Sequence, residues 1–366
     1  MRQLRIIIAG GGTGGHIFPA IAIARALLRL RPDTQILFVG AVGKMEMEKV
    51  PQAGFEIVGL DIVGFNRSNL LANLSLPGKL LKSRNAARKI IDRFKPDVIV
   101  GVGGYASYPM LSAGQAARIP TLIQEQNSYA GKSNKMLANR AKAICVAYDN
   151  MSRFFPASAI LFTGNPVREL ITGMNGNSND CKLKFGLQPG KKTILVVGGS
   201  QGAKSINEAV SACLEKWVAD GLQIIWQTGK AYFETAAGSA VKYQNSVFVK
   251  DFITGMDDAY TAADIVVSRA GALAIAELCI AARPVIFVPY PFAAENHQWS
   301  NAQALVDKGA ALIINDNEIN DKLYNTVSAL ANNAQQMTAM SQELGKMAIR
   351  DADERIANKI FEIAGK

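Results

Sequence analysis

The stretch from Ser268 to Asn301 brings phosphate-binding and hydroxyl-binding groups together within a short part of the chain. An apolar run at 264–268 predicts a buried parallel strand, Gly271 ends it, and residues 272–282 favour a helix. Backbone N–H groups at the start of such a helix, together with the positive end of its dipole, can bind a diphosphate. The pattern therefore predicts a phosphate-binding helix N-terminus.

The same predicted helix carries one carboxylate, Glu277, about one and a half turns from its start. A carboxylate can accept two hydrogen bonds from a vicinal diol such as that of ribose. Taken alone, Glu277 is equally compatible with a solvated helix residue. The loop after the next predicted strand, 284–288, holds Glu-Asn-His-Gln at 295–298, which are side chains that bind hydroxyl groups. The three features together predict a nucleotide-sugar site.

A second glycine-rich turn, at 10–15, follows the short apolar strand predicted at 5–9. The turn matches the GxGxxG pattern of dinucleotide-binding proteins. Such a site also needs an acidic residue at the end of the second strand, and the strand predicted at 35–39 ends in Gly40 and Ala41 instead. A dinucleotide is therefore disfavoured as the ligand of this turn.

His16 lies where this turn meets a predicted helix, 17–30. The chain has only two histidines, and both are in loops predicted at the carboxyl ends of strands. An imidazole exchanges protons near neutral pH, so His16 is a candidate general base. Packing or helix capping is the alternative role for this side chain.

The length of 366 residues predicts two domains. Each half begins with a strand, a glycine turn and a helix, first around 6–15 and again around 193–203, and strands then alternate with helices. This order predicts an α/β protein with two Rossmann-like, doubly wound parallel sheets. A polar stretch at 173–180 is the best linker, and the expected domains are 1–164 and 165–340.

Charge and cysteine content limit the classes of partner and cofactor. Residues 1–165 contain 21 Lys and Arg against 9 Asp and Glu, whereas residues 166–340 contain 14 against 16. The net charge of +10 therefore arises in the first half, which predicts that this half alone meets an anionic substrate or surface. The four cysteines are widely spaced and no histidines cluster, so reduced thiols are expected and no metal site.

The segment 64–95 combines leucines with an excess of basic residues. Its leucine-rich part has more apolar residues than a helix broken by Pro, Gly and Asn can bury, which predicts docking on anionic lipid headgroups. Nucleic acid is disfavoured, because the interior of the stretch lacks aromatic residues for base stacking. The residues expected to face the membrane are Leu70, Leu71, Leu74, Lys79, Lys82 and Arg84.

Six motifs follow one another along the chain: GGTGGH (11–16), GGYASYP (103–109), GNPVR (164–168), GGSQGA (198–203), SRAGALAIAEL (268–278) and PYPFAAENHQ (289–298). In this combination the chain resembles the MurG family, bacterial transferases that add N-acetylglucosamine to undecaprenyl-diphosphate-linked muramoyl-pentapeptide. The resemblance covers nearly the whole chain. It implies the GT-B architecture, with two Rossmann-like domains facing across a cleft, and a final helix at 341–366 that packs back on the first domain. It also implies inversion at the anomeric carbon without a metal or other cofactor.

The resemblance also implies roles for individual residues. On the first domain, Thr13, Gly14 and Gly15 would contact phosphates, His16 would be the base, Tyr105 would belong to the acceptor side and Asn127 would meet the donor sugar. At the donor, Arg168 and Ser200 would lie at the uridine diphosphate, Ile253 would read the uracil edge through its backbone, Ala272, Leu273, Ala274, Ile275, Ala276 and Glu277 would hold phosphate and ribose, and Gln298 would bind the N-acetylglucosamine hydroxyls.

The resemblance therefore implies an inverting hexosyltransferase of peptidoglycan synthesis, which supports cell shape and division. The expected partners are UDP-N-acetylglucosamine, the lipid-linked muramoyl-pentapeptide and an anionic membrane, and the expected location is the cytoplasmic face of the inner membrane. Two other functions stay open. A UDP-N-acetylglucosamine epimerase of the same architecture would have no use for the leucine-rich basic surface, and a non-catalytic nucleotide-sugar-binding partner of a membrane enzyme would need only one set of glycine loops.

Overall fold

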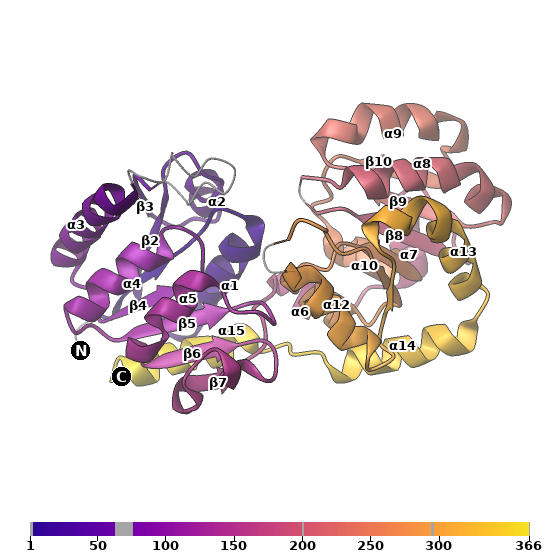
Figure 1. Cartoon of the computed structure of the whole chain (residues 1–366). Helices are drawn as coiled ribbons and strands as arrows, with labels where there is room; N and C mark the ends of the chain where they lie inside the picture. Colours follow the sequence, from indigo (N-terminus) through magenta and orange to yellow (C-terminus); the bar gives the residue numbers. More distant parts are fainter. Residues whose placement is uncertain (1–2, 63–75, 200, 294–295, 366) are drawn as a thin grey trace. The chain divides into compact units, whose positions relative to one another are not determined.

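The computed structural model describes residues 3–62, 76–199, 201–293 and 296–365 (Figure 1). The chain forms two compact units: unit 1 comprises Met1–Arg168 and Asp351–Lys366, and unit 2 comprises Glu169–Arg350. Some predicted site residues lie outside the described residues, namely Leu70, Leu71, Leu74 and Ser200.

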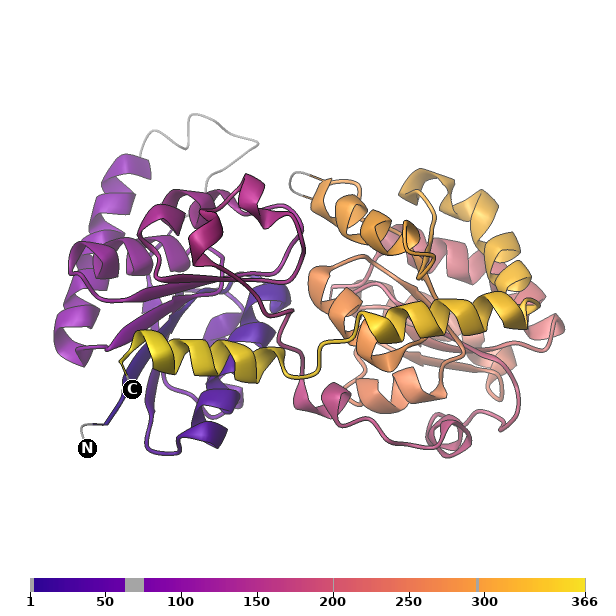
Figure 2. The same ribbon diagram turned by 90° about the horizontal axis from the view of Figure 1, so that it is seen from below.

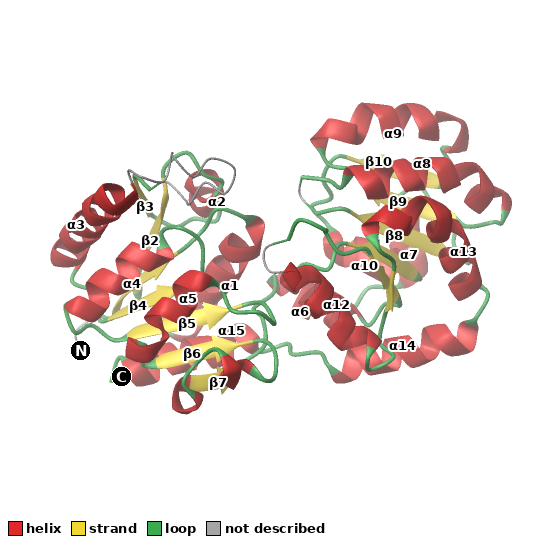
Figure 3. Ribbon diagram, viewed as in Figure 1, coloured by secondary structure: helices red, strands yellow, loops and turns green. Residues whose placement is uncertain are grey.

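In the part of the chain that the structure describes, unit 1 contains a seven-stranded parallel sheet in the order β3-β2-β1-β4-β5-β6-β7 (Figure 3). The strands are β1 (Arg5–Ala9), β2 (Gln35–Ala41), β3 (Ile57–Leu60), β4 (Val98–Gly101), β5 (Thr121–Glu125), β6 (Ala143–Val146) and β7 (Ile160–Phe162). The chain runs outward from β1 to β3 and returns to place β4 on the other side of β1, which is the strand order of a Rossmann fold.

Helices cover both faces of this sheet (Figure 2). They are α1 (Gly14–Leu30), α2 (Glu46–Gln52), α3 (Leu76–Phe94), α4 (Ser107–Ala116), α5 (Lys132–Leu137) and α15 (Ala352–Ile363). Ile6 and Ile8 pack with α1 and α15, whereas Ile7 and Ala9 pack with α3, α4 and α5. Successive side chains of a strand point to opposite faces, so the uninterrupted apolar run of β1 contributes to both cores.

Across its described residues, unit 2 repeats this plan with six parallel strands in the order β10-β9-β8-β11-β12-β13. The strands are β8 (Thr193–Val197), β9 (Gln223–Gln227), β10 (Val247–Lys250), β11 (Ile265–Ser268), β12 (Val285–Phe287) and β13 (Leu312–Ile313). The helices are α6 (Glu169–Thr172), α7 (Ser178–Lys184), α8 (Lys204–Ala219), α9 (Phe233–Ala240), α10 (Met256–Ala262), α11 (Ala272–Ala281), α12 (His297–Val306), α13 (Ile319–Ala331) and α14 (Ala334–Lys346). One large core cluster contains the fully buried Trp217 and Trp226.

The strand order reverses once in each unit, between β1 and β4 in unit 1 and between β8 and β11 in unit 2. Loops at the carboxyl ends of strands on either side of such a reversal diverge, and ligands bind in the crevice that results. The four loops concerned span 10–13, 102–106, 198–203 and 269–271. Each of them belongs to one of the motifs that the sequence identifies.

The prediction of a single terminal helix from residue 341 is wrong, because α14 ends at Lys346 and α15 begins at Ala352. Leu344 of α14 is buried within unit 2, whereas Ile356 of α15 is buried in the core of unit 1. The residues between the two helices, 347–351, are not helical, and the chain passes from unit 2 to unit 1 there. An ion pair of 3.1 Å between Arg29 and Asp353 joins α15 to α1.

The four cysteines are free and buried. Burial raises the pKa of the Cys145 and Cys279 thiols to about 12. At neutral pH these two thiols are protonated and are therefore poor nucleophiles. None of the helices in the described ranges has the length and apolar character needed to cross a bilayer.

We predict that Ile360→Ala lowers the free energy of unfolding of unit 1 by about 2–5 kcal/mol, because this fully buried side chain joins α15 to the sheet. All three tryptophans belong to unit 2, so their fluorescence does not report on unit 1. Amide hydrogen exchange in β1 and β4 measures the change instead. Glu362→Ala on the same helix, with its side chain 67% exposed, is the control and should change stability by less than about 0.5 kcal/mol. Equal protection from hydrogen exchange in the wild type, Ile360→Ala and Glu362→Ala would contradict the prediction.

Candidate active site

The glycine turn after β1 lies backbone to backbone against the turn after β4. The Gly11 N–H donates to the Gly103 carbonyl oxygen at 3.2 Å. A Cβ atom at Gly104 would fall 2.1 Å from the Gly11 carbonyl oxygen, and Gly104 has a φ of +84°. Only glycine meets both conditions without displacing a turn. The motifs GGTGGH and GGYASYP therefore form one continuous surface.

The His16 ring contacts both of these turns. Its Nδ1 atom is 3.0 Å from the Gly11 carbonyl oxygen. A carbonyl oxygen only accepts hydrogen bonds, so this contact places the proton on Nδ1 and the lone pair of the neutral ring on Nε2. A Cβ atom at Gly103 would lie 2.8 Å from Nε2, so glycine at this position makes room for the ring. The geometry therefore fits the neutral tautomer whose Nε2 can accept a proton.

Most other residues expected near His16 lie on the same surface. Thr13 is the N-cap of α1, and its carbonyl oxygen accepts from the His16 N–H at 3.1 Å. Thr13 and Gly15 are exposed, and Gly14 is partly exposed. Tyr105 is 48% exposed, and its ring lies beside Gly12. The structure thus brings Thr13, Gly14, Gly15, His16 and Tyr105 together.

Asn127 follows β5 and is held by a buried carboxylate. Glu125, 2% exposed, accepts hydrogen bonds from Asn127 N at 3.1 Å, Gly131 N at 2.9 Å and Asn134 Nδ2 at 2.8 Å. The neighbouring Gln126 donates to the Val102 carbonyl oxygen at 2.7 Å, which ties this loop to the end of β4. The sequence prediction named Asn127 but missed the polar side chains beneath it.

Arg168 lies in unit 1, unlike the other described residues expected at the uridine diphosphate, which belong to unit 2. Its guanidinium group lies over the ring of Phe18 on α1, 6.0 Å from the ring centroid. This cation–π contact places the charge within the first two turns of the helix that carries His16.

In unit 2, the glycine turn after β8 also packs directly on backbone. A Cβ atom at Gly202 would fall 2.1 Å from the Thr228 carbonyl oxygen, and one at Gly229 would fall 2.5 Å from the Gln201 carbonyl oxygen. Both glycines have a positive φ, of +77° and +74°. As in unit 1, the glycines allow two turns to approach more closely than any side chain would permit.

Gln227 links the glycine turn to the loop that holds Ile253. Its Nε2 donates to the Gly199 carbonyl oxygen at 3.2 Å, and its Oε1 accepts from the Ile253 N–H at 2.9 Å. Gln227 and Ile253 are both buried. Because the Ile253 N–H already donates to a side chain, its carbonyl oxygen is the backbone group suited to recognise a base edge. The sequence prediction named Ile253 and missed Gln227.

Helix α11 begins immediately after Gly271, its N-cap residue, and has no acidic residue in its first turn. Glu277 is 8% exposed, so the solvated alternative for this residue is wrong. The hydroxyl of Tyr260, on α10 and also buried, donates to Glu277 Oε2 at 3.1 Å. The carboxylate is therefore held in one orientation by a partner that the sequence prediction did not identify.

Arg269 connects the ends of several strands in unit 2. Its Nη1 donates to the carbonyl oxygens of Val288 at 2.9 Å and Pro289 at 3.2 Å, and it pairs with Asp316. The second nitrogen, Nη2, donates to Ser205 at 3.0 Å, at the start of α8. The loop after β12 is thereby fixed relative to the glycine turn.

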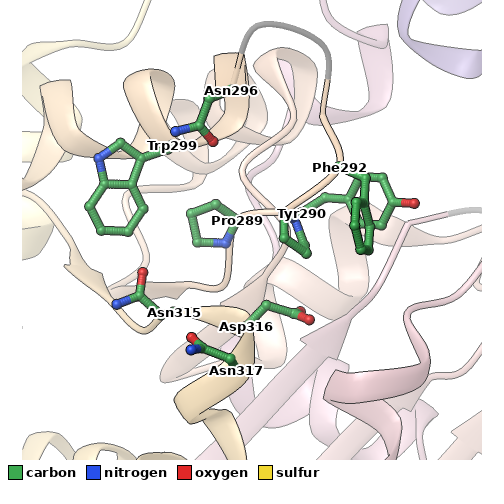
Figure 4. A pocket seen from close by; sticks show the side chains of 9 residues that line it. Pro289, Tyr290, Phe292, Asn296, Trp299, Asn315, Asp316 and Asn317 are labelled. Atoms are coloured by element: carbon green, nitrogen blue, oxygen red, sulfur yellow. The ribbon is translucent and has the colours of Figure 1, made fainter. Parts of the chain in front are cut away.

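A cavity of about 680 Å³ opens beside this loop (Figure 4). The side chains that line it come from the loop after β12, from the start of α12 and from the turn at 315–317. Gln298, expected at the donor sugar, uses its Oε1 to accept from the Tyr290 N–H at 3.0 Å. Its amide N–H groups are therefore the part of this side chain suited to a sugar hydroxyl.

Each unit carries groups of the kind that a sugar transfer uses. Unit 1 offers a histidine in the tautomer of a base, and unit 2 offers a helix start, a buried carboxylate and a backbone carbonyl. Within the described ranges, no group of three or more His, Cys, Asp or Glu side chains is arranged to hold a metal ion. The Asp351-Ala-Asp353 sequence is used otherwise, since Asp351 pairs with Arg355 at 3.0 Å and Asp353 pairs with Arg29.

Two Rossmann-like units with glycine turns at their switch points are the domains of a GT-B fold, and the matches to family models identify a glycosyltransferase. Residues 6–146 match the glycosyltransferase family 28 N-terminal domain, and residues 193–356 match the family 28 C-terminal domain. The chain therefore belongs to glycosyltransferase family 28 and, as its full-length relatives show, to the MurG family within it.

Two of these relatives carry the name UDP-N-acetylglucosamine--N-acetylmuramyl-(pentapeptide) pyrophosphoryl-undecaprenol N-acetylglucosamine transferase. The one from Parabacteroides distasonis is 49% identical over 367 aligned positions, which cover 100% of both chains. The one from Bacteroides thetaiotaomicron is 50% identical over 99% of this chain and 98% of its own. The crystal structure of MurG from Acinetobacter baumannii has a TM-score of 0.78 and 30% identity, over 99% of this chain and 100% of that one.

We predict that Tyr260→Phe raises the Kd for UDP about three- to tenfold, because Glu277 loses the roughly 1 kcal/mol hydrogen bond that orients it toward a ribose diol. Calorimetric titration measures the change. Tyr324→Phe is a matched control, since the Tyr324 hydroxyl also donates to a carboxylate, Asp220, at 2.9 Å, on an exposed surface of the same unit. An unchanged Kd in Tyr260→Phe would show that Tyr260 does not act on the nucleotide.

Proposed function

We propose that this chain transfers N-acetylglucosamine from UDP-N-acetylglucosamine to the undecaprenyl-diphosphate-linked muramoyl-pentapeptide. The observation that carries this proposal is the identity of about half of all positions, over the full length, with relatives named for this transfer. The product is the lipid-linked disaccharide used in peptidoglycan synthesis. The protein acts at the cytoplasmic face of the inner membrane as a peripheral protein.

The donor binds to unit 2 in this proposal. The Ile253 carbonyl oxygen accepts the uracil N3–H, and Glu277 accepts two hydrogen bonds from the ribose hydroxyls. The diphosphate lies at the start of α11, near residues 272–276 and the glycine turn that includes Ser200. Gln298 and Asn127 bind the sugar, and Arg168 binds the diphosphate. The buried positions of Glu277 and Ile253 support specific recognition, because a mismatched ligand leaves buried polar groups unpaired.

The reaction is a single displacement with inversion at the anomeric carbon. His16 Nε2 accepts the proton of the acceptor sugar hydroxyl, whose oxygen attacks the anomeric carbon as the bond to the diphosphate breaks. Thr13, Gly14, Gly15 and Tyr105 position the acceptor. N–H groups at the start of α11 stabilise the charge that develops on the leaving diphosphate. The Nδ1–H···O=C contact of His16 supports this assignment, because it keeps Nε2 as the proton acceptor.

The test is transfer of labelled sugar from UDP-N-acetylglucosamine to a lipid-diphosphate-muramoyl-pentapeptide. The labelled disaccharide should form only when both substrates are present. An epimerase would convert the donor without the acceptor, and a binding protein would yield no product with either. Incubation with the donor alone, followed by separation of the UDP-sugars, therefore distinguishes the three functions.

We predict that His16→Ala lowers turnover by about 10²–10⁴-fold through loss of the general base. The Kd for UDP should remain within twofold of the wild-type value, since UDP binds to unit 2. Steady-state kinetics across a pH range, with calorimetry for UDP, measures both effects. A fall of less than about tenfold with the acidic limb of the pH–rate profile retained would assign His16 to capping or to orienting the acceptor.

The membrane surface in this proposal lies on unit 1 around α3. Along the described part of this helix, Lys82, Arg84, Arg88, Lys89 and Arg93 are exposed, whereas Ala87 and Ile91 are buried in the core. Asp92 is the only acidic residue in the helix sequence. Such a basic face attracts anionic headgroups by roughly 1 kcal/mol per base. Lys79, Leu70, Leu71 and Leu74 extend this surface in the proposal.

We predict that Lys82→Glu with Arg84→Glu weakens binding to phosphatidylglycerol vesicles at least about tenfold at low salt. Wild-type binding should also fall steeply as salt rises, because screening shortens the range of the attraction. A matched control is Lys242→Glu with Lys346→Glu, two lysines of unit 2 that are 66% and 70% exposed. Vesicle co-sedimentation measures all three proteins.

A second variant tests the leucines of the proposed surface. Leu70→Ser with Leu74→Ser should slow transfer to the long-chain acceptor and spare a short, water-soluble acceptor analogue. Equal losses on both acceptors, or unchanged vesicle binding in both sets of variants, would place the docking surface elsewhere.

A further inference from the structure

A carboxylate lies beneath the glycine turn of unit 1. Glu46, the first residue of α2, is 2% exposed. Its Oε2 accepts from the Gly12 N–H at 2.7 Å, and its Oε1 accepts from the Ala41 N–H at 2.9 Å. The sequence does not single out this position, because Glu46 is one of two glutamates in a short stretch that mixes charged and apolar residues.

The Glu46 side chain packs closely against two glycines. A Cβ atom at Gly11 would fall 2.2 Å from its carboxyl carbon, and one at Gly40 would fall 2.5 Å from its Cγ. Both glycines therefore make room for this one side chain. Gly40 and Ala41 are also the positions where a dinucleotide-binding protein would end its second strand with an acidic residue. Here a carboxylate reaches the turn from a later helix instead.

The Gly12 N–H and the Gly11 carbonyl belong to the same peptide group. Glu46 accepts from the N–H end of that group, and His16 Nδ1 donates to its carbonyl end at 3.0 Å. Hydrogen bonds in such a chain polarise one another in the protein interior. A carboxylate at the N–H end draws the N–H dipole toward itself, which makes the carbonyl oxygen a stronger acceptor.

We infer that Glu46 acts on His16 through the Gly11–Gly12 peptide, as the positioning residue that orients the imidazole and strengthens it as a base. The arrangement is a carboxylate–histidine pair with one peptide group between its members. When His16 Nε2 takes a proton from an acceptor hydroxyl, Nδ1 keeps its own proton, and the positive charge of the imidazolium is stabilised along this chain. The role assigned to His16 rests on the proposed function, but the effect of Glu46 on the ring does not.

Three other polar or titratable side chains are described near the turn. The Tyr105 ring lies beside Gly12. The Arg168 guanidinium lies over the ring of Phe18, and Phe18 is on the same helix as His16. Thr13 Oγ1 is 3.5 Å from His16 Nδ1, at the limit of a hydrogen bond. Of these groups, only Glu46 carries a negative charge. Removing that charge should therefore make the protonated His16 ring less stable. The ring should then lose its proton at a lower pH.

The first test uses the wild-type protein and needs no activity. The chain has two histidines, so a His297→Gln variant assigns the His16 signals in ¹⁵N and ¹³C NMR spectra. We expect the neutral His16 ring to carry its proton on Nδ1. A neutral ring protonated on Nε2 would overturn the inference, because the peptide could not then connect it to Glu46.

The second test compares Glu46→Gln with Glu48→Gln. The Glu48 side chain is 67% exposed on the same helix, so its replacement removes the same charge without touching the turn. In Glu46→Gln the NMR titration midpoint of His16 should fall by about half to one pH unit, and in Glu48→Gln it should stay in place. If Glu46→Gln does not fold, Glu46→Asp shortens the reach of the carboxylate and should move the midpoint in the same direction by less.

Kinetics separates this role from a merely structural one. Glu46→Gln should lower turnover about 10- to 100-fold and move the acidic limb of the pH–rate profile to lower pH. A fall in turnover with neither the limb nor the NMR midpoint displaced would mean that Glu46 only shapes the turn, and would overturn the inference. A displaced midpoint in a protein that shows no sugar transfer would instead contradict the proposed function and leave the inference intact.

Discussion

Both candidate half-sites depend on direct contact between the backbones of two turns. In unit 1, Gly104 lies against the Gly11 carbonyl, and in unit 2, Gly202 lies against the Thr228 carbonyl; a Cβ atom would come within 2.1 Å of the oxygen in each case. Any side chain at either glycine would push the turns apart. His16 bonds to Gly11, and Gln227 bonds to Gly199, so both side chains would move with the turns. The spacing of the glycines therefore determines where the functional groups lie.

Buried polar side chains then fix the conformation of each turn. Glu46, Glu125 and Gln227 are each at most 3% exposed, and each accepts a backbone N–H from a turn or loop that carries a candidate site residue. A buried carboxylate is costly unless it is hydrogen-bonded, and here two N–H groups donate to Glu46 and four donate to Glu125. These bonds hold the backbone dipoles of the turns in fixed directions, and fixed dipoles favour stabilisation of a transition state.

The sequence predicts most of the fold because apolar strands, glycine turns and helices alternate with clear spacing. It misses β3, a four-residue strand, and it joins α14 to α15, since the pattern cannot reveal that their apolar residues face separate cores. Motifs identify His16, Glu277 and Ile253, but not Glu46, Tyr260 or Gln227. The three missed residues are buried, and each makes a hydrogen bond to a residue 17 to 34 positions away in the chain. A single sequence shows neither burial nor such pairings.

The two units have related topologies, but their buried carboxylates bind different partners. An N–H that donates to a carboxylate does not also bind a phosphate well, so the Gly12 N–H is unsuited to an anion once Glu46 occupies it. In unit 2, the first turn of α11 has no acidic residue, and Glu277 lies beyond that turn, bonded to Tyr260. These contacts agree with the proposed roles, in which the leaving diphosphate lies at α11 and His16, linked to Glu46 through one peptide group, accepts the proton. In the proposed function, the base of unit 1 and the nucleotide site of unit 2 therefore each depend on a buried carboxylate, Glu46 and Glu277 respectively.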